Sequence, residues 1–329
     1  MPGSWSKYPR LLIYGVRRGG LRARRAVAEM MPAGYRNLLE KEATHWKKGE
    51  KGHTWLDSST IQALANAEIS GDEQVYWLLH FMRKHLPTGD GPGLVLGCGT
   101  GGLELNAVSI GLCNQFHSFD ISKGALDKCK QAVESADGEI ETFKADLNKI
   151  SLVHNFYAIA FAVNILHHLV DLEHVLDEVK KSLRPGGFFV VHEYVGPARF
   201  QWTEAQIGEA GRILASMPRK YRRNRRKGFM SRQRLYLPPL DATSRDSPFE
   251  AARSDEIVPL LEKRFEVVEK VNIGGALLHP LLEAIVENFD DNNPKDREML
   301  VDLWRREKDL MAKGVLGNDF VYAVLRKVG

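Results

Sequence analysis

A short apolar run that ends in glycines, residues 93–102 (GLVLGCGTGG), constrains the fold of this chain more than any other feature. The apolar residues before the glycines predict a strand, and the apolar pattern after them predicts a helix. Gly97, Gly99 and Gly101 let the backbone turn sharply and let a ligand approach without meeting a Cβ atom. The amide groups at the start of the helix then favour an anionic group.

The glycine spacing fits two classes of cofactor-binding protein. Gly97, Gly99 and Gly102 satisfy GxGxxG, whereas Gly97, Gly99 and Gly101 satisfy GxGxG. In a dinucleotide enzyme the anionic group is a pyrophosphate, and in a methyltransferase it is the carboxylate of S-adenosylmethionine. The spacing alone leaves both classes open.

Strand and helix patterns alternate from Leu94 onward, which is typical of a doubly wound α/β sheet. Strands are expected at 94–96, 116–119, 140–143, 157–163, 188–194, 264–271 and 320–327. Helices are expected at 59–69, 73–86, 102–111, 122–136, 171–183, 203–216, 277–289 and 295–311. We therefore predict a seven-stranded, mainly parallel, Rossmann-like sheet.

The same patterns divide the chain into four parts. These are a helical N-terminal cap or substrate region (1–90), a cofactor-binding core (91–196), a basic insertion or lid (197–256), and the C-terminal part of the core (257–329). The insertion separates the fifth strand from the sixth, where the alternation is interrupted.

Composition and charge limit the cellular context. The net charge is +4, but residues 1–36 contain eight Lys/Arg and one acid, and residues 219–234 contain nine Lys/Arg and no acid. Three cysteines in a chain of 329 residues favour reduced thiols and a cytoplasmic location. No apolar run approaches the roughly 20 residues of a membrane span. The basic N-terminal residues also fit a transit peptide or an interfacial anchor.

Two carboxylates follow the second and third expected strands. Asp120 stands 19 residues beyond Gly101, where a carboxylate can accept hydrogen bonds from both hydroxyls of a ribose. Asp146 can accept from an adenine amino group while the Leu147 amide faces a ring nitrogen. Alternatively, Asp120 could only cap the next helix, and Asp146 could be an ordinary loop residue. A nicotinamide enzyme does not require the second acid.

Five segments together resemble the class I S-adenosylmethionine-dependent methyltransferases of the small-molecule type. They are LVLGCGTGG (94–102), FDIS (119–122), KADL (144–147), NILHHL (164–169) and LRPGGFFVVHE (183–193). The resemblance covers roughly residues 90–195. It implies a seven-stranded sheet in which the seventh strand runs antiparallel between the fifth and the sixth.

The resemblance also implies S-adenosylmethionine as the cofactor and assigns residues to its three parts. The methionine part would be held by Gly97, Cys98, Gly99, Gly101 and Asn164, the ribose by Asp120 and Ile121, and the adenine by Asp146 and Leu147. Two positions depart from the family pattern. Val95 stands where an acid is common, which weakens one expected contact to the amino-acid part, and Tyr157 stands where an Asp is common.

The methyl donor is already activated, so the protein must align the acceptor and exclude water. A hydroxyl acceptor also needs a base. His168 is the first candidate, with Glu193 and His167 as the others. His192 and Glu193 would point to opposite faces of a strand, and Glu193 lies nearer its end. We expect no metal site, because His167 and His168 are adjacent rather than spaced for one helical face.

The acceptor site is less well defined by the sequence. Tyr194 could form one wall, and Phe200 and Trp202 could line the site or belong to the core below the insertion. Arg222 and Arg223, in the basic stretch, could draw in an anionic acceptor, although a charge run is usually a solvated face.

These observations predict an enzyme that methylates an oxygen of a small-molecule, glycan or lipid-linked acceptor. RNA methylation stays open because of the basic stretches, although residues 164–167 (NILH) replace the Asn/Asp-Pro-Pro-aromatic motif of amino-directed enzymes. An inactive interaction subunit and a nicotinamide dehydrogenase also stay open. The sequence does not define the acceptor or the oligomeric state.

Overall fold

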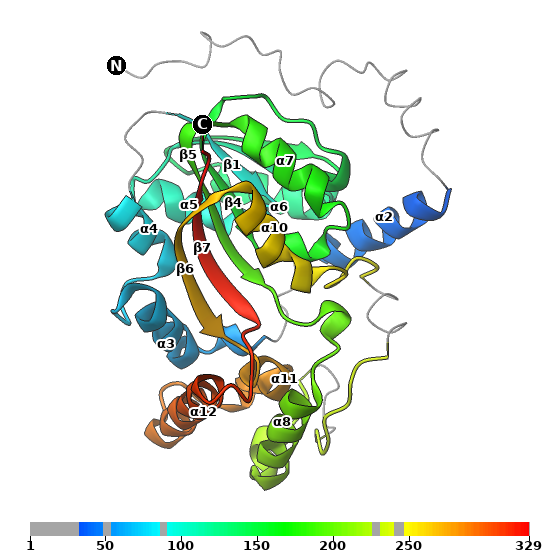
Figure 1. Cartoon of the computed structure of the whole chain (residues 1–329), viewed down its shortest axis with the longest axis vertical. Coiled ribbons are helices and arrows are strands. Elements are labelled where there is room, and N and C mark those ends of the chain that lie inside the picture. The colour runs from blue at the N-terminus through cyan, green and yellow to red at the C-terminus, as the bar shows by residue number, and fades with distance from the viewer. Residues whose placement is uncertain (1–32, 49–53, 86–90, 226–230, 240–246, 329) are drawn as a thin grey trace.

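The computed structural model describes residues 33–48, 54–85, 91–225, 231–239 and 247–328. A seven-stranded sheet forms its centre (Figure 1). The strands are β1 (Gly93–Leu96), β2 (Gln115–Asp120), β3 (Glu139–Lys144), β4 (Tyr157–Val163), β5 (Leu183–Tyr194), β6 (Glu266–Gly274) and β7 (Phe320–Arg326). Their order is β3-β2-β1-β4-β5-β7-β6, and only β7 is antiparallel to its neighbours. The predicted sheet and its antiparallel strand are confirmed.

Ten helices of five or more residues lie within the described ranges. They are α2 (Ala33–His45), α3 (Ser59–Ser70), α4 (Trp77–His85), α5 (Gly102–Ser109), α6 (Lys123–Val133), α7 (Leu172–Ser182), α8 (Glu204–Ser216), α10 (Ile257–Arg264), α11 (Leu278–Leu282) and α12 (Pro294–Ala312). None of them is long and apolar enough to cross a lipid bilayer.

The sheet is buried on both faces, which explains the near-continuous apolar runs of its central strands. Val95 faces one apolar cluster, which also takes residues from α4, α5 and α6. Leu94 and Leu96 face the other, which is covered by α7 and α10. Alternate residues of one strand thus fill two separate cores.

The predicted helix at 277–289 is wrong in its second half. Helix α11 ends at Leu282, and Ala284 adopts a left-handed backbone with φ of 60°. The Arg232 guanidinium donates to the carbonyls of Leu281 and Glu283 at 3.1 and 2.9 Å, and the Arg225 amide donates to the Ala284 carbonyl at 2.8 Å. Residues of the insertion therefore satisfy carbonyls that a longer helix would use internally.

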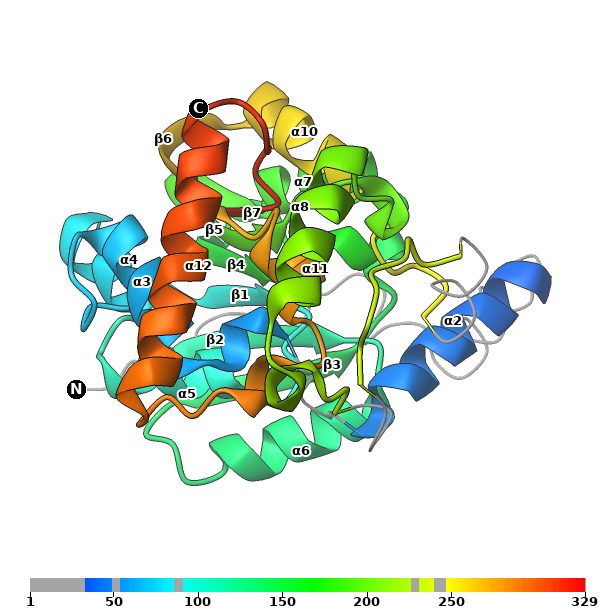
Figure 2. The same cartoon turned by 90° about the horizontal axis from the view of Figure 1, so that it is seen from below.

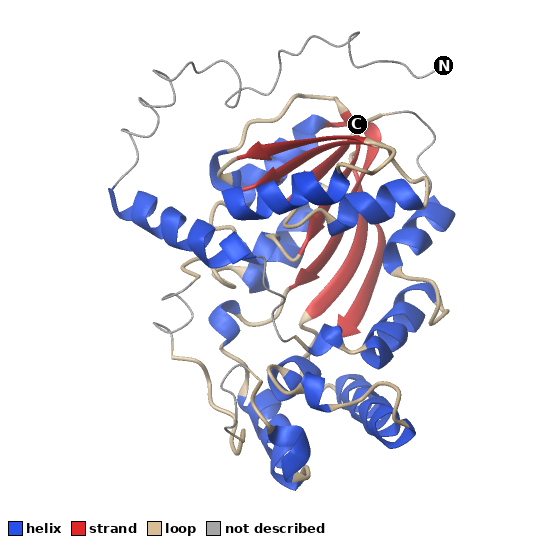
Figure 3. Ribbon diagram, turned by 180° about the vertical axis from the view of Figure 1, so that it is seen from behind, coloured by secondary structure: helices blue, strands red, loops and turns tan. Residues whose placement is uncertain are grey.

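The helices of the N-terminal region lie in two different places. In Figure 1 α3 and α4 lie along the β6 side of the sheet, whereas α2 extends on the opposite side of the molecule. Figure 2 shows the same separation from below. Figure 3 shows α8, α11 and α12 beyond the end of the strands. The basic segment within residues 1–32 lies outside the described residues.

Candidate active site

The carboxyl ends of three parallel strands meet at one edge of the sheet. Leu96 pairs with Phe119, and Asp120 pairs with Lys144, so the turns after β1, β2 and β3 are neighbours. In open α/β sheets this edge is where ligands bind. The structure therefore places the predicted glycine turn beside both predicted carboxylates.

The glycine turn needs its glycines for two different reasons. Gly97, Gly99 and Gly101 have φ values of 66°, 53° and 88°, a region that side chains disfavour. A Cβ on Gly97 would lie 2.5 Å from Cγ1 of Ile165. A Cβ on Gly99 would meet no heavy atom within 4 Å. The first glycine is required by packing, and the second faces space that a ligand can enter.

Asp120 is held against this turn by backbone amides. Its Oδ2 accepts from the Gly99 amide at 3.0 Å, and its Oδ1 accepts from the Ser122 amide at 2.7 Å. Burial raises the pKa of Asp120, while these amides and the nearby His168 oppose the shift. Each carboxylate oxygen retains a second acceptor position, which two ribose hydroxyls could use.

Asp146 has a partner that the sequence did not indicate. Its Oδ2 accepts from the Tyr35 hydroxyl of α2 at 2.9 Å, and its Oδ1 accepts from the Asn148 amide at 3.0 Å. Burial and the Asp146 carboxylate raise the pKa of Tyr35, which therefore stays a neutral donor. Leu147, assigned to the adenine with Asp146, is buried beside it.

The turn after β4 is organised by one buried carboxylate. Asn164 adopts a left-handed backbone with φ of 50°, and a short 3-10 turn, Leu166–His168, follows it. Glu193 on β5 accepts from the amides of Ile165 (2.8 Å) and Leu166 (2.6 Å) through Oε2, and from the Tyr194 amide (2.8 Å) through Oε1. Glu193 is fully buried, so its carboxylate stabilises this turn.

His167 lies between two carboxylates. Its Nδ1 contacts Oε1 of Glu193, and its Nε2 lies 3.5 Å from Oε1 of Glu250. Burial disfavours a charged imidazole, but Glu193 and Glu250 outweigh it and raise the pKa of His167 to about 10. His167 is therefore protonated at neutral pH and is a poor base.

His168 lies between two other carboxylate oxygens. Its Nδ1 is 3.2 Å from Oε1 of Glu42, and its Nε2 is 3.8 Å from Oε2 of Glu250. The edge of the ring packs against Trp46, with centroids 5.1 Å apart. Burial opposes ionisation of Glu250, yet His168 and His167 lower the pKa of this carboxyl to about 2.

The histidine–glutamate cluster consists of five buried or nearly buried residues: Glu42, His167, His168, Glu193 and Glu250. Sequence reasoning identified the two histidines and Glu193 but missed Glu42 and Glu250. These two come from α2 and from the end of the insertion, and neither belongs to a recognisable motif.

The loop that carries Glu250 is held in a strained conformation. The Arg199 amide donates to the Ala251 carbonyl at 2.6 Å, and its guanidinium donates to the carbonyls of Pro248 and Glu250 at 2.8 and 2.9 Å. Arg199, Phe200 and Ala251 all have positive φ. Strained backbone of this kind is common at functional sites.

Comparison with known proteins identifies the central part of the chain. Residues 94–191 match the family model described as a methyltransferase domain. Residues 94–191 therefore form a methyltransferase domain. This confirms the family to which the five sequence motifs pointed.

The similarity to curated proteins covers only part of this chain. A squalestatin tetraketide synthase of Phoma sp. (strain C2932) is 32% identical over 108 residues, which are 30% of this chain and 4% of that protein. Sterol 4-C-methyltransferase strm-1 of Caenorhabditis elegans is 24% identical over 102 residues, 31% of this chain and 30% of that protein. The chain thus spans between 4% and 30% of the length of these curated relatives.

Among solved structures, geranyl diphosphate methyltransferase in complex with GPP and sinefungin is similar with a TM-score of 0.46 and 16% sequence identity. The similarity covers 75% of this chain and 76% of that one.

An aromatic group adjoins the histidines of the methyltransferase domain. Tyr194 lies with its ring centroid 6.0 Å from His167 and 5.0 Å from Phe200, and Phe200 stacks on Trp202 at 5.7 Å. The Tyr194 hydroxyl donates to the Pro197 carbonyl at 3.0 Å. The three predicted substrate residues therefore lie together next to the cluster, and their role in acceptor binding stays a prediction.

The basic stretch that follows α8 is anchored on the C-terminal part of the chain. Tyr221 stacks on Phe289 with centroids 4.6 Å apart, and its hydroxyl donates to Asp296 at 2.5 Å. Arg222 and Arg223 follow this anchor, and their contact with an acceptor stays a prediction. Arg226 and Lys227 of the same stretch lie outside the described residues.

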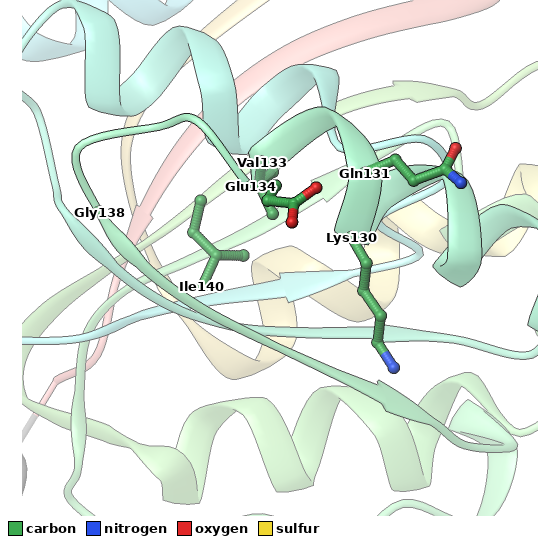
Figure 4. Close-up of a pocket in the computed structure, with 6 residues that line it drawn as sticks. All are labelled: Lys130, Gln131, Val133, Glu134, Gly138 and Ile140. Atoms are coloured by element: carbon green, nitrogen blue, oxygen red, sulfur yellow. The ribbon is translucent and has the colours of Figure 1, made fainter.

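A cavity of about 330 Å³ lies apart from these residues, between α6 and the start of β3 (Figure 4). Its lining residues are Lys130, Gln131, Val133, Glu134, Gly138 and Ile140. It contains no residue of the glycine turn, of the histidine–glutamate cluster or of the two predicted nucleoside carboxylates.

Proposed function

We propose that this chain transfers a methyl group from S-adenosylmethionine to an oxygen of a small-molecule, glycan or lipid-linked acceptor. The observation that carries the proposal is the open space at Gly99, directly beside Asp120, at the carboxyl edge of the sheet. A ligand can reach the backbone there and meet a carboxylate at once.

The methionine part of the cofactor would follow the turn from Gly97 to Gly101, with its carboxylate near the amides at the start of α5. The ribose hydroxyls would donate to Asp120. The adenine amino group would donate to Asp146, which already accepts from Tyr35. Cys98, Ile121 and Asn164 would complete the site.

The cluster offers one base for an acceptor hydroxyl. Glu193 is unsuited, because three amides and His167 already use its oxygens. His167 is protonated. His168 is left as the base, with Glu42 and Glu250 at 3.2 and 3.8 Å from its two ring nitrogens. The sulfonium leaves as a neutral thioether, so the acceptor proton is the only charge that the protein must accommodate.

Calorimetry on the full chain tests the cofactor assignment. We expect S-adenosylhomocysteine to bind and NADH to show no heat of binding. A panel of hydroxylated small molecules, glycans and RNA, with S-adenosylhomocysteine formation as the readout, then tests the acceptor class. Binding of NADH, or of neither nucleoside, would overturn the proposal, and turnover on RNA alone would overturn the acceptor class.

A further inference from the structure

Two histidines and one glutamate bring one potential metal-ligand atom each close together. His167 and His168 are adjacent on the 3-10 turn after β4, and Glu250 reaches them from the end of the insertion. One ligand atom of each residue, an imidazole nitrogen or a carboxylate oxygen, lies within 4.8 Å of the other two.

The separations between these atoms are informative. Nε2 of His167 is 3.5 Å from Oε1 of Glu250, and Nε2 of His168 is 3.8 Å from Oε2 of the same residue. Both exceed the roughly 2.7–3.2 Å of a good N–H···O hydrogen bond. With metal–ligand bonds of roughly 2.0–2.2 Å, neighbouring ligand atoms of a tetrahedral site lie about 3.4 Å apart. The spacing therefore suits three atoms around one ion.

Each imidazole is also supported from behind by a carboxylate. Nδ1 of His167 contacts Glu193, and Nδ1 of His168 lies 3.2 Å from Glu42. A carboxylate at one ring nitrogen keeps the proton there, leaves the other nitrogen free as a ligand and raises its basicity. Nε2 of His167 thus faces Glu250 in the carboxylate–histidine–metal arrangement. Nδ1 of His168 lies near Glu42 but makes no hydrogen bond, and a small rotation of either side chain would complete the same arrangement there.

The charge of the cluster favours a cation at the same point. Glu42, Glu193 and Glu250 surround the two imidazoles, and the Arg199 guanidinium lies near Glu250 and Glu42. Uncompensated charges are costly to bury. Two protons or one divalent ion would reduce the excess of negative charge equally, and both would bind at the same imidazole nitrogens. The ion additionally accounts for the 3.5 and 3.8 Å spacing.

We propose that His167, His168 and Glu250 form a three-ligand site for a divalent transition-metal ion, with Glu193 and Glu42 as positioning residues. Two imidazoles and one carboxylate suit Zn²⁺ better than Mg²⁺ or Ca²⁺, which prefer oxygen ligands. A fourth ligand would have to come from solvent or substrate, and Glu250 is the most exposed of the three residues, with 18% of its side chain accessible. This differs from the sequence expectation, which could not include Glu250.

The proposal changes one step of the proposed function. An acceptor hydroxyl bound at the ion would have a lowered pKa and would release its proton to solvent as its oxygen takes the methyl group. His168 would then be a ligand rather than the base. Metal binding itself does not depend on methyl transfer, so it can be tested without cofactor or acceptor.

The experiment uses the full chain, stripped with a chelator and titrated with Zn²⁺ and with Co²⁺ as a spectroscopic probe. We expect one ion per chain and a tetrahedral Co²⁺ spectrum without a thiolate charge-transfer band. His168→Gln and Glu250→Gln should each weaken binding at least tenfold, and Glu42→Gln about tenfold through loss of support for His168. His154→Ala, which removes an exposed histidine, is the matched control and should bind as the wild type does.

Three outcomes would overturn the proposal. The first is that the wild type shows no stoichiometric binding. The second is that Glu250→Gln and His168→Gln, shown to be folded by circular dichroism, bind as tightly as His154→Ala. The third is that Co²⁺ gives a thiolate charge-transfer band. The last result would place the ion at Cys98 and Cys129, whose sulfur atoms also lie within 4.8 Å of each other. Should a variant fail to fold, the Co²⁺ spectrum of the wild type still decides between the two sites. Failure to bind S-adenosylhomocysteine would leave the metal result unaffected.

Discussion

The hydroxyl of Tyr35 lies 2.9 Å from Oδ2 of Asp146, although 111 positions separate the two residues. The Tyr35 ring also packs near Phe249, with centroids 5.9 Å apart, and Nζ of Lys149 lies 4.7 Å from the ring centroid. Helix α2 therefore reaches the carboxylate assigned to the adenine and, through Glu42, the histidine–glutamate cluster. One N-terminal helix joins the two halves of the site.

Tyr35→Phe tests whether this hydroxyl competes with the adenine. The substitution keeps the ring and removes a donor to Asp146, so we expect S-adenosylhomocysteine to bind about three- to tenfold more tightly, within the range of one net hydrogen bond. Calorimetry measures the change. Weaker binding would show instead that Tyr35 orients Asp146 for the cofactor.

Gly97→Ala and Gly99→Ala form a matched pair that should differ in how strongly they destabilise the fold. Both add a Cβ at positive φ, but only the first would meet Ile165 at 2.5 Å. We expect Gly97→Ala to lower the free energy of unfolding by about 2–4 kcal/mol and Gly99→Ala by about 1 kcal/mol. Denaturant unfolding measures both. Gly99→Ala should nevertheless weaken S-adenosylhomocysteine binding at least tenfold, and unchanged affinity would argue against a ligand at this turn.

Asp120→Ala removes the proposed ribose partner. We expect S-adenosylhomocysteine to bind at least tenfold more weakly, a loss of about 1.4 kcal/mol or more. Because Asp120 also accepts from the Gly99 amide, Asp120→Asn serves as the control that retains one acceptor oxygen. Affinity equal to that of the wild type in Asp120→Ala would remove the ribose assignment.

Asp319 should give the protein a distinct dependence of stability on pH. Burial raises the pKa of this carboxyl from 3.8 to about 7, opposed by the Gln206 amide at 2.9 Å. The native state then keeps a proton that the unfolded chain has lost, so this group makes the protein less stable as pH rises from about 4 to about 7, and the effect levels off above that.

Asp319→Asn mimics the protonated carboxyl and should remove this dependence. Between pH 5 and pH 8 the variant should gain about 2–3 kcal/mol of unfolding free energy relative to the wild type, since one pKa unit is worth about 1.4 kcal/mol. Urea unfolding at the two pH values measures the gain. Asp302→Asn, at an exposed aspartate, is the control. Parallel pH profiles for Asp319→Asn and the wild type would contradict the assignment.

The sequence by itself determined the seven strands of the sheet and its glycine turn, and the family resemblance implied the antiparallel place of the seventh strand. Strand and helix periods, turn glycines and the spacing from Gly101 to Asp120 are local features, and local backbone preferences produce the same strand, turn and helix in any context that buries them. The two carboxylates could be placed at one edge because parallel strands end together. The helix at 277–289 was predicted too long because Arg225 and Arg232, far away in the chain, take its carbonyls.

Only the tertiary structure decided what surrounds His167 and His168. Glu42, Glu250 and Tyr35 reach the site from α2 and from an irregular loop, and no periodic pattern in the sequence links these segments to the turn after β4. The ionisation of a histidine, and its capacity to hold an ion, depend on the charges within a few ångströms of it. Those charges are set by which distant segments pack together, and a local motif does not encode that.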